Sequence, residues 1–395
     1  MATRVLFLHN NGDWMRGSEN ALLTVIQGMD KQAFAAHLIC GNPLFVAAAK
    51  EADALASLHS MPEIMLDGTH VRFQFLRWAR TVRRLASYAR QHRIDLIYCN
   101  GGSTTQVGYF AGKAAGVPVV SHIHSPYSRR YVLLYRFHRV AKTIFVSEAI
   151  QRSICAKQAF RARYEVVYNG VDTDRFSPVQ VRNAAWRERF RIPADAIVFG
   201  QISSLISRKG IDVLLDAFQS VCARHANARL LLVGDGPERA KFIAHASRLG
   251  INEKVIFAGN HPDPLPFYQH VMDINVLASR SDAFPLSVLE AASSALPTIG
   301  SAVDGIPESV LDGRTGILFR SENVTSLAEK MSSLLVDDSL RHTLGNAARQ
   351  SAVQRFSIHA YRSAIERIIR EEAAPVPLRA PRASQVPIVS ENAQK

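Results

Sequence analysis

Cysteine is scarce in this sequence, and long apolar runs are absent from it. The four cysteines are scattered with no metal-ligand or redox spacing, so we expect free thiols in a reducing cytoplasm; they are Cys40, Cys99, Cys155 and Cys222. No apolar run approaches the roughly 18 residues that cross a bilayer. The first run, RVLFL at 4–8, is too short for a signal-peptide core and is typical of a buried strand. Hydrophobic residues make up 47% of the chain and charged residues 21%, which indicates a packed globular protein.

Acidic residues are also in short supply. The formal net charge is +13, and it is unevenly placed, because residues 68–147 hold thirteen Lys or Arg against one acid, Asp95. We therefore expect this region to meet an anionic partner, either lipid headgroups, a phosphorylated acceptor or nucleic acid.

Short apolar runs rich in β-formers alternate with helical patterns along the whole chain. Examples are DLIYC at 95–99 and TIFVS at 143–147, and the pattern restarts after residue 190 with AIVFGQI at 196–202. Near-continuous apolar strands separated by helices predict parallel sheets covered on both faces, and two such series predict two doubly wound Rossmann-like α/β domains. The turn formers of NGVDTDRFSP at 169–178 mark their junction. The tail at 373–395 holds four prolines without helical period, and we expect it to be disordered.

Charged residues follow two of the predicted strands. Ligands of parallel sheets bind beyond the carboxyl ends of the strands. After the first strand of the second series, Arg208 and Lys209 directly precede a helix that begins near Gly210, and two cations beside free N–H groups form an anion site.

The stretch SDAFPLSVLE at 281–290 follows another strand and has an acid at each end. Asp282 lies in the loop before a helix opened by Pro285, and Glu290 lies a turn into that helix. Free N–H groups in the loop suit a diphosphate, and carboxylates suit sugar hydroxyls. A nucleotide sugar satisfies all three groups, with its diphosphate at the loop N–H groups, its ribose at Glu290 and its second sugar at Asp282.

These segments together resemble a known family. KGIDVLLDAF, LLVGDGPER, VIFAGN, DAFPLSVLEAASSALPTIGS and GIPESVLDGRTGILF resemble, in order and spacing, the retaining glycosyltransferases of the GT-B fold that carry a Glu-x7-Glu motif (family 4-like, group 1). In the first half MRGSEN at 15–20, HIHSP at 122–126 and YNGVDTDRF at 168–176 are similar to further family segments. The resemblance covers about residues 4–372.

The resemblance implies roles for individual residues. His124, Lys209 and Asp282 would be catalytic: His124 and Asp282 at the donor sugar, and Lys209 at the diphosphate. The implied donor-binding residues are Gly17, Ser204, Arg208, Lys209, Phe284, Pro285, Leu286 and Glu290, with Glu290 on the ribose. Three positions depart from the family pattern, because Ser204 stands for an Arg, Ser125 for an Asp and Asp282 for a Glu.

No cofactor or metal is expected beyond the nucleotide diphosphate-sugar substrate. The DTD at 172–174 mimics an Asp-x-Asp metal site, but it falls within the interdomain turn. Cations and a helix end already serve the diphosphate.

Two basic segments remain to be explained. Residues 71–94 hold seven arginines and no acid, with Phe75, Ala79, Val82, Ala86 and Ala89 at helical spacing, and residues 127–140 add arginines among aromatics. One interpretation is an ordinary helix with a solvated basic side. The other is a surface that rests on anionic lipid.

The sequence thus predicts a GT-B protein that transfers a sugar, with retention, to an acceptor hydroxyl. The acceptor would be a glycan or glycolipid, lipid-linked or part of a cell-surface polysaccharide, met by a cytoplasmic protein peripheral on the inner membrane face. The expected parts are an acceptor-binding domain at 1–172, a nucleotide-sugar domain at 173–356 and a returning helix at 357–372. The alternatives are a sugar-nucleotide 2-epimerase on the same fold and a basic nucleic-acid-binding protein; the second lacks a recognisable module or aromatic array.

Overall fold

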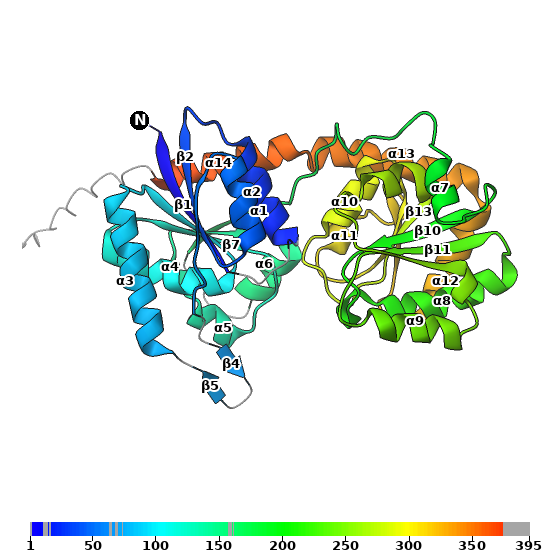
Figure 1. Cartoon of the computed structure of the whole chain (residues 1–395), viewed down its shortest axis with the longest axis horizontal. Coiled ribbons are helices and arrows are strands. Elements are labelled where there is room, and N and C mark those ends of the chain that lie inside the picture. Colours follow the sequence, from blue (N-terminus) through cyan, green and yellow to red (C-terminus); the bar gives the residue numbers. More distant parts are fainter. Residues whose placement is uncertain are drawn as a thin grey trace, which may run out of the picture.

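The computed structural model describes residues 2–373 except 11–14, 16, 63–64, 68–69, 73, 157–159 and 161. The tail that the sequence predicts to be disordered lies outside the described residues, apart from Ala373. The described chain forms two lobes side by side, each with a central sheet between helices (Figure 1).

The first sheet is parallel throughout its described strands, in the order β3-β2-β1-β6-β7-β8-β9. Its strands are β1 (Thr3–His9), β2 (Phe34–Cys40), β3 (Leu55–Leu58), β6 (Leu96–Asn100), β7 (Val119–Ile123), β8 (Lys142–Phe145) and β9 (Arg163–Val166). The central strands are buried along their whole length, as their near-continuous apolar sequences predict. A separate antiparallel pair, β4 (Met65–Asp67) and β5 (His70–Arg72), was not predicted.

The second sheet is also parallel, in the order β12-β11-β10-β13-β14-β15. Its strands are β10 (Ile197–Ile202), β11 (Ala228–Val233), β12 (Val255–Gly259), β13 (Ile274–Leu277), β14 (Thr298–Ser301) and β15 (Gly316–Phe319). The prediction of two doubly wound parallel sheets is therefore confirmed.

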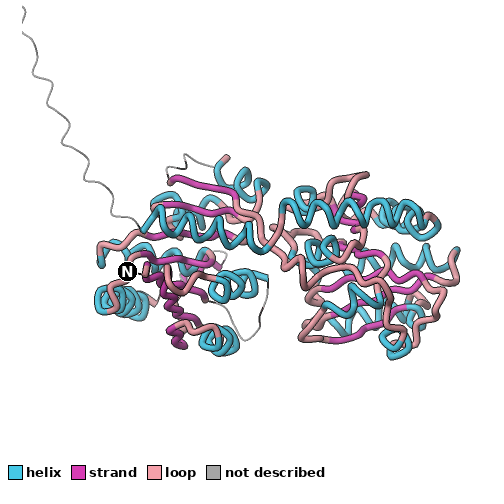
Figure 2. The backbone as a smooth tube through the Cα atoms, turned by 90° about the horizontal axis from the view of Figure 1, so that it is seen from above, coloured by secondary structure: helices cyan, strands magenta, loops and turns pink. Residues whose placement is uncertain are grey.

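Helices cover both faces of each sheet (Figure 2). In the first lobe they are α1 (Gly17–Gly28), α2 (Pro43–Glu51), α3 (Phe75–Gln91), α4 (Gly102–Ala115), α5 (Arg129–Leu134), η1 (Phe137–Arg139) and α6 (Glu148–Cys155). In the second they are α7 (Ala185–Arg189), η2 (Ser207–Lys209), α8 (Ile211–Arg224), α9 (Arg239–Arg248), η3 (Asn252–Lys254), the π-helical turn η4 (Phe267–Val271), α10 (Leu286–Ser293), α11 (Ile306–Ser309), α12 (Val324–Val336) and α13 (Asp338–Arg355). None of the described helices is both long and apolar enough to span a membrane.

The last helix, α14 (Ile358–Ala373), returns to the first lobe. It buries Ile365 and Ile369 in the same hydrophobic cluster as residues of α1, β1 and β6 (Figure 1). The chain passes between the lobes twice, near Val171 and near Phe356. These two segments run side by side, since Val171 N donates to Phe356 O at 2.8 Å and Ile358 N donates to Val171 O at 2.8 Å. Gly170 permits this approach, because a Cβ there would lie 2.9 Å from Ile358 Cα.

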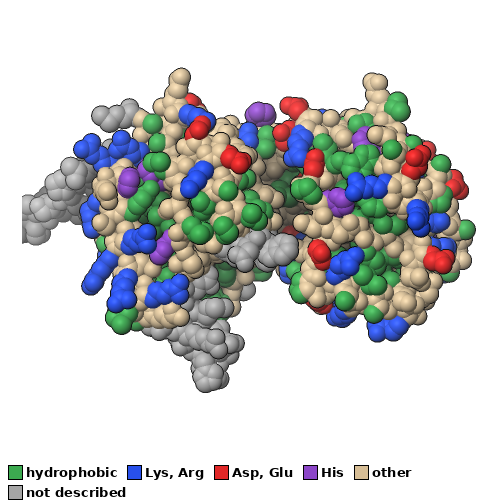
Figure 3. Space-filling view, in the orientation of Figure 1, with side chains coloured by type: hydrophobic (Ala, Val, Ile, Leu, Met, Phe, Trp, Pro, Cys, Tyr) green, Lys and Arg blue, Asp and Glu red, His purple; other side chains and the backbone are tan. Residues whose placement is uncertain are grey.

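Helix α3 exposes its arginines. Arg77, Arg80 and Arg84 face solvent, and no arginine of α3 pairs with an acid within the described chain. Of the apolar positions at helical spacing, Ala86 and Ala89 are buried, but Phe75 is 55% exposed on the first turn. Lys and Arg side chains gather over this part of the first lobe (Figure 3).

Candidate functional site

A cavity of about 560 Å³ lies between the lobes, beyond the carboxyl ends of strands from both sheets. Its lining contains every predicted site residue except Glu290: Gly17, His124, Ser204, Arg208, Lys209, Asp282, Phe284, Pro285 and Leu286. The residues that depart from the family pattern, Ser204, Ser125 and Asp282, all line it. Asp282 is the only acid among the described lining residues.

One wall of the cavity is cationic. Lys209 Nζ lies 2.5 Å from Asp282 Oδ2, with side chains 14% and 12% exposed, and Arg208 Nη1 donates to Ser281 O at 2.7 Å. The turn that presents both cations needs Gly210, which has a φ of +63° and would place a Cβ 1.9 Å from Ala278 O. Two residues that the resemblance assigns to different parts of a donor are thus paired with each other.

The loop before α10 offers unpaired donors to the same cavity. No described residue accepts from the main-chain N–H groups of Ala283, Phe284, Leu286 or Ser287. The sequence predicted Pro285 as the first helical residue, which is wrong: Pro285 is the extended N-cap of α10, and the helix begins at Leu286. These N–H groups and the two cations form a surface suited to an anion.

Packing at the domain junction holds this loop in place. The Phe284 ring stacks on Tyr168 at a centroid distance of 4.8 Å and contacts Phe356, so the residue is 4% exposed although it lines the cavity. Asn169 Nδ2 donates to Phe284 O at 3.1 Å. Asn169 also lines the cavity, and its Oδ1 is buried without a partner among the described residues. Asn169 was not among the residues predicted for the site, although its place in the predicted interdomain turn was an available signal.

Glu290 lies off the cavity lining. Tyr268 Oη, from η4, donates to Glu290 Oε2 at 3.0 Å. Burial raises the pKa of Glu290 to about 7, against the opposing effects of the Tyr268 hydrogen bond and Arg175. The carboxyl is therefore poised between its neutral and charged forms near neutral pH.

The opposite wall belongs to the first lobe. His124 follows β7, and its Nε2 lies 2.6 Å from Asn100 Oδ1. Burial, with His9 nearby, lowers the pKa of His124 to about 3, so the ring is neutral at pH 7. Gly17 opens α1 on this wall, where an added Cβ would lie 3.8 Å from Leu286 Cδ1 of the other lobe. Because that is an ordinary contact, steric crowding alone does not require glycine there.

Within the described residues, no group of three or more His, Cys, Asp or Glu side chains is arranged to hold a metal ion. The acid that opens the DTD segment has a local partner instead, because Asp172 Oδ1 accepts from Asp174 N at 3.1 Å and Arg175 N at 3.0 Å. This is a turn-stabilising arrangement.

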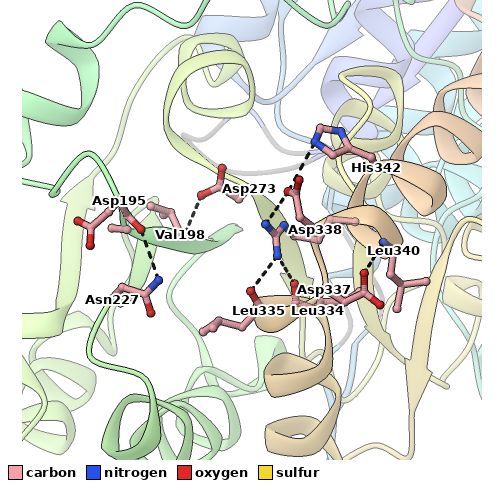
Figure 4. A network of polar contacts seen from close by, with 12 residues as sticks. Asp195, Val198, Asn227, Asp273, Leu334, Leu335, Asp337, Asp338, Leu340 and His342 are labelled. Carbon is pink, nitrogen blue, oxygen red and sulfur yellow. Dashed lines mark hydrogen bonds and ion pairs between the residues drawn. The ribbon is translucent and has the colours of Figure 1, made fainter.

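A second cavity, of about 710 Å³, lies at the amino ends of β10 and β13. Most of the charged side chains that line this second cavity are already paired with one another. Asp273 accepts from Arg182 and Arg187, and also from Val198 N, a contact that Figure 4 shows. Arg341 binds Asp338 and the main-chain O atoms of Leu334 and Leu335 at the end of α12. The cavity between the lobes, with its unpaired N–H groups, is therefore the candidate active site.

Comparison with family models agrees with this architecture. The model for "Glycosyltransferase Family 4" matches residues 15–175, and the model for "Glycosyl transferases group 1" matches residues 183–351. The chain belongs to the family 4-like, group 1 glycosyltransferases. The boundary between the two matches falls in the turn that joins the lobes, so each lobe of this glycosyltransferase family member corresponds to one model.

Individual relatives are more distant. The GDP-mannose-dependent alpha-(1-6)-phosphatidylinositol monomannoside mannosyltransferase of Mycolicibacterium smegmatis is 31% identical over 217 residues, 53% of this chain and 56% of that protein. The D-inositol 3-phosphate glycosyltransferase of Kribbella flavida is 27% identical over 332 residues, 75% of this chain and 78% of that protein. The match thus spans little more than half of the first relative. The structure of Anabaena HepE in complex with UDP has a TM-score of 0.82 at 21% identity, covering 93% of this chain and 100% of that one, which shows the GT-B fold.

Proposed function

We infer that the protein transfers a sugar from a nucleotide diphosphate-sugar to an acceptor hydroxyl, with retention at the anomeric carbon. The observation that carries this function is the cavity wall where Lys209 and Arg208 meet the unpaired N–H groups of the loop at 283–287. Opposite that wall, a neutral histidine faces the same space. A diphosphate fits the first wall and a sugar fits the space between the two.

Departure of the diphosphate is the step that this wall stabilises. Negative charge grows on the leaving oxygen, and fixed N–H groups and cations placed beforehand stabilise that charge without reorganisation. Lys209 would exchange part of its contact with Asp282 for the phosphate. Asp282 would then face the sugar, where positive charge develops as the bond breaks. No metal is required for this arrangement, since two cations and the helix end supply the compensating charge.

Retention is proposed to follow a front-face route rather than a covalent one. Asp282 is the only acid among the described lining residues, and its salt bridge to Lys209 makes it a weak candidate nucleophile. The acceptor hydroxyl would attack from the side that the diphosphate leaves, with a phosphate oxygen taking its proton.

The acceptor is proposed to be a glycan or glycolipid at a membrane. Support comes from the arginines of α3, none of which pairs with an acid in the described chain, and from Phe75 and Leu76, which are 55% and 69% exposed beside them. Arg129 and Arg130 of α5 are exposed as well. A basic surface with apolar side chains at one end suits a cytoplasmic protein resting on anionic headgroups.

The first test is a thermal-shift screen of the purified chain against UDP, GDP, UDP-glucose and GDP-mannose, followed by product analysis. We expect one nucleotide family to stabilise the protein, and sugar transfer to require an added acceptor. Turnover of the donor into an epimer without acceptor would favour the 2-epimerase instead. Salt-sensitive oligonucleotide binding without any nucleotide-sugar response would favour nucleic-acid binding.

A further inference from the structure

A chain of buried polar side chains crosses the carboxyl ends of three neighbouring strands. His9 ends β1, Asn100 ends β6 and His124 follows β7, while Glu19 reaches the chain from the first turn of α1. Glu19, His9 and Asn100 are 0%, 2% and 3% exposed. Of these four residues only His124 lines the cavity, and only His124 was predicted to have a role in the site.

The hydrogen bonds link these four side chains without a gap. His124 Nε2 lies 2.6 Å from Asn100 Oδ1, Asn100 Nδ2 lies 3.0 Å from His9 Nδ1, and His9 Nε2 lies 3.0 Å from Glu19 Oε1. The Asn100 amide nitrogen also donates to Ser18 O at 3.1 Å. Ser18 Oγ donates to the other carboxylate oxygen, Oε2 of Glu19, at 2.9 Å.

Two groups that can only accept set the direction of the whole chain. The Ser18 carbonyl requires that the nitrogen of the Asn100 amide faces it, which leaves Oδ1 toward His124. The Glu19 carboxylate requires a proton on His9 Nε2. His9 Nδ1 lies 3.0 Å from Asn100 Nδ2 and 3.2 Å from the main-chain O of Asn100. Because the Ser18 carbonyl keeps Nδ2 as the donor of the amide, Nδ1 accepts from Nδ2 when the ring carries its single proton on Nε2. Asn100 Oδ1 in turn requires a proton on His124 Nε2.

The consequence reaches the cavity. His124 has one remaining ring nitrogen, Nδ1, for which no described residue is a hydrogen-bond partner. The lowered pKa of His124 keeps the ring neutral, so a proton on Nε2 means a lone pair on Nδ1.

We propose that Glu19, His9 and Asn100 are positioning residues that hold His124 as its Nε2–H tautomer, so that Nδ1 accepts a hydrogen bond from a hydroxyl of the bound sugar. This rests on the proposed function for the identity of the ligand, but the tautomer itself is a property of the free protein. If Nδ1 only accepts, the site favours a ligand hydroxyl beside it and disfavours a ligand group that can only accept a hydrogen bond.

The decisive measurement is nitrogen NMR of the protein with ¹⁵N-labelled histidine, in which the shifts of the two ring nitrogens distinguish the tautomers. His124→Asn assigns the signals. We expect an unprotonated Nδ1 and a protonated Nε2 in the wild type at pH 7. A protonated Nδ1 on His124 overturns the proposal without any assay of activity.

Glu19→Gln tests the far end of the chain. A glutamine amide can donate to His9 Nε2, which would move the His9 proton to Nδ1 and disturb the Asn100 contact. We expect a mixed His124 tautomer and a fall in turnover of roughly tenfold, the size of one lost hydrogen bond, with UDP or GDP affinity unchanged. Glu19→Asp, which still only accepts, should keep the wild-type tautomer.

Two further variants separate positioning from folding. Glu372→Gln removes another buried acid of the same lobe, paired with Arg163, and should leave the His124 signals unchanged. If Glu19→Gln does not fold, His9→Phe keeps a ring against Phe45 while cutting the chain, and the same loss of a single tautomer is expected. Unchanged His124 shifts in a folded Glu19→Gln or His9→Phe protein contradict the proposal. Absence of any nucleotide-sugar turnover in the wild type contradicts the proposed function instead.

Discussion

Glu308 caps a helix of the other lobe. Its carboxylate, on α11 of the second lobe, accepts from Ala149 N at 2.7 Å and Glu148 N at 2.8 Å, the first two residues of α6 in the first lobe. The Glu308 side chain is only 12% exposed. Free N–H groups at a helix start favour a carboxylate, so this contact joins the lobes beside the cavity and favours the arrangement seen here.

Replacing Glu308 with Ala should loosen that joint. A helix cap is worth about 1–2 kcal/mol, so we expect amide hydrogen exchange at Glu148 and Ala149 to rise by roughly tenfold. Solution scattering should show a wider spread of lobe orientations. Glu329→Ala on the exposed face of α12 is the control. Equal exchange in Glu308→Ala and wild type would show that α6 does not depend on the contact.

Lys209→Ala should weaken binding of the nucleoside diphosphate. A charge-assisted contact contributes roughly 1.5–3 kcal/mol, so we expect at least about a tenfold loss of UDP or GDP affinity by calorimetry. The loss should exceed that of the phosphate contact alone, because Asp282 is left without its partner beside an incoming anion. Lys241→Ala, on the exposed side of α9, is the matched control. Unchanged affinity in a folded Lys209→Ala protein would remove the diphosphate from this wall.

The sequence predicted both sheets because their central strands are buried on two faces and read as apolar runs. β2 and β3 were not identified. FAAHLIC has two alanines and a histidine in its centre, and β3 is an edge strand with exposed side chains. At the site, the motifs predicted which loops meet. They did not predict the pairing of Lys209 with Asp282 or of His9 with Asn100, because such contacts depend on how strands far apart in sequence are ordered in the sheet. The motifs also did not predict that Glu290 is paired with Tyr268, because Tyr268 lies in a π-helical turn elsewhere in the sequence.

The basic face of α3 should bind anionic vesicles. Arg77, Arg80 and Arg84, replaced together by Gln, should weaken binding to phosphatidylglycerol vesicles, and salt above about 0.15 M should weaken wild-type binding as well. The control replaces three exposed arginines of the second lobe: Arg224, Arg314 and Arg320. Equal binding to neutral and anionic vesicles, or none to either, would contradict a membrane-facing role.

Glu290 should make stability depend on pH. Its pKa is about 7 in the folded protein and is raised from the ordinary value of 4.5, so the folded state holds the proton more tightly. The contribution is therefore complete below about pH 4.5 and is lost as pH rises through 7. Because the side chain is partly exposed, we expect a loss of about 1–2 kcal/mol between pH 5 and pH 8 in urea unfolding. The Glu290→Gln protein should lack this part of the pH dependence; an identical profile would mean that Glu290 titrates normally.

Replacing Asp282 and replacing Glu290 should have different effects on donor affinity and turnover. Glu290→Gln removes a group assigned to the ribose, a contact that substrate and transition state share, so donor affinity should fall first. Asp282→Asn should lower turnover more than affinity, because positive charge grows on the sugar as the diphosphate departs. It also frees Lys209 from its present partner, which should keep nucleoside diphosphate binding as strong as in the wild type or strengthen it.

Asp282→Glu then separates a positioned carboxylate from a tolerated one. The longer side chain restores the family's usual residue but must fit beside Lys209 in a space where Asp282 is 12% exposed. If the cavity is built around the shorter acid, the change should slow turnover while Lys209 remains paired; if the shorter acid is merely tolerated, turnover should stay equal or rise. Steady-state kinetics on Asp282→Asn, Asp282→Glu and Glu290→Gln, with UDP and GDP binding measured alongside, distinguish these outcomes. Full activity in both Asp282→Asn and Glu290→Gln would mean that the two acids serve the fold, because neither a shared contact nor a transition-state contact would have been lost.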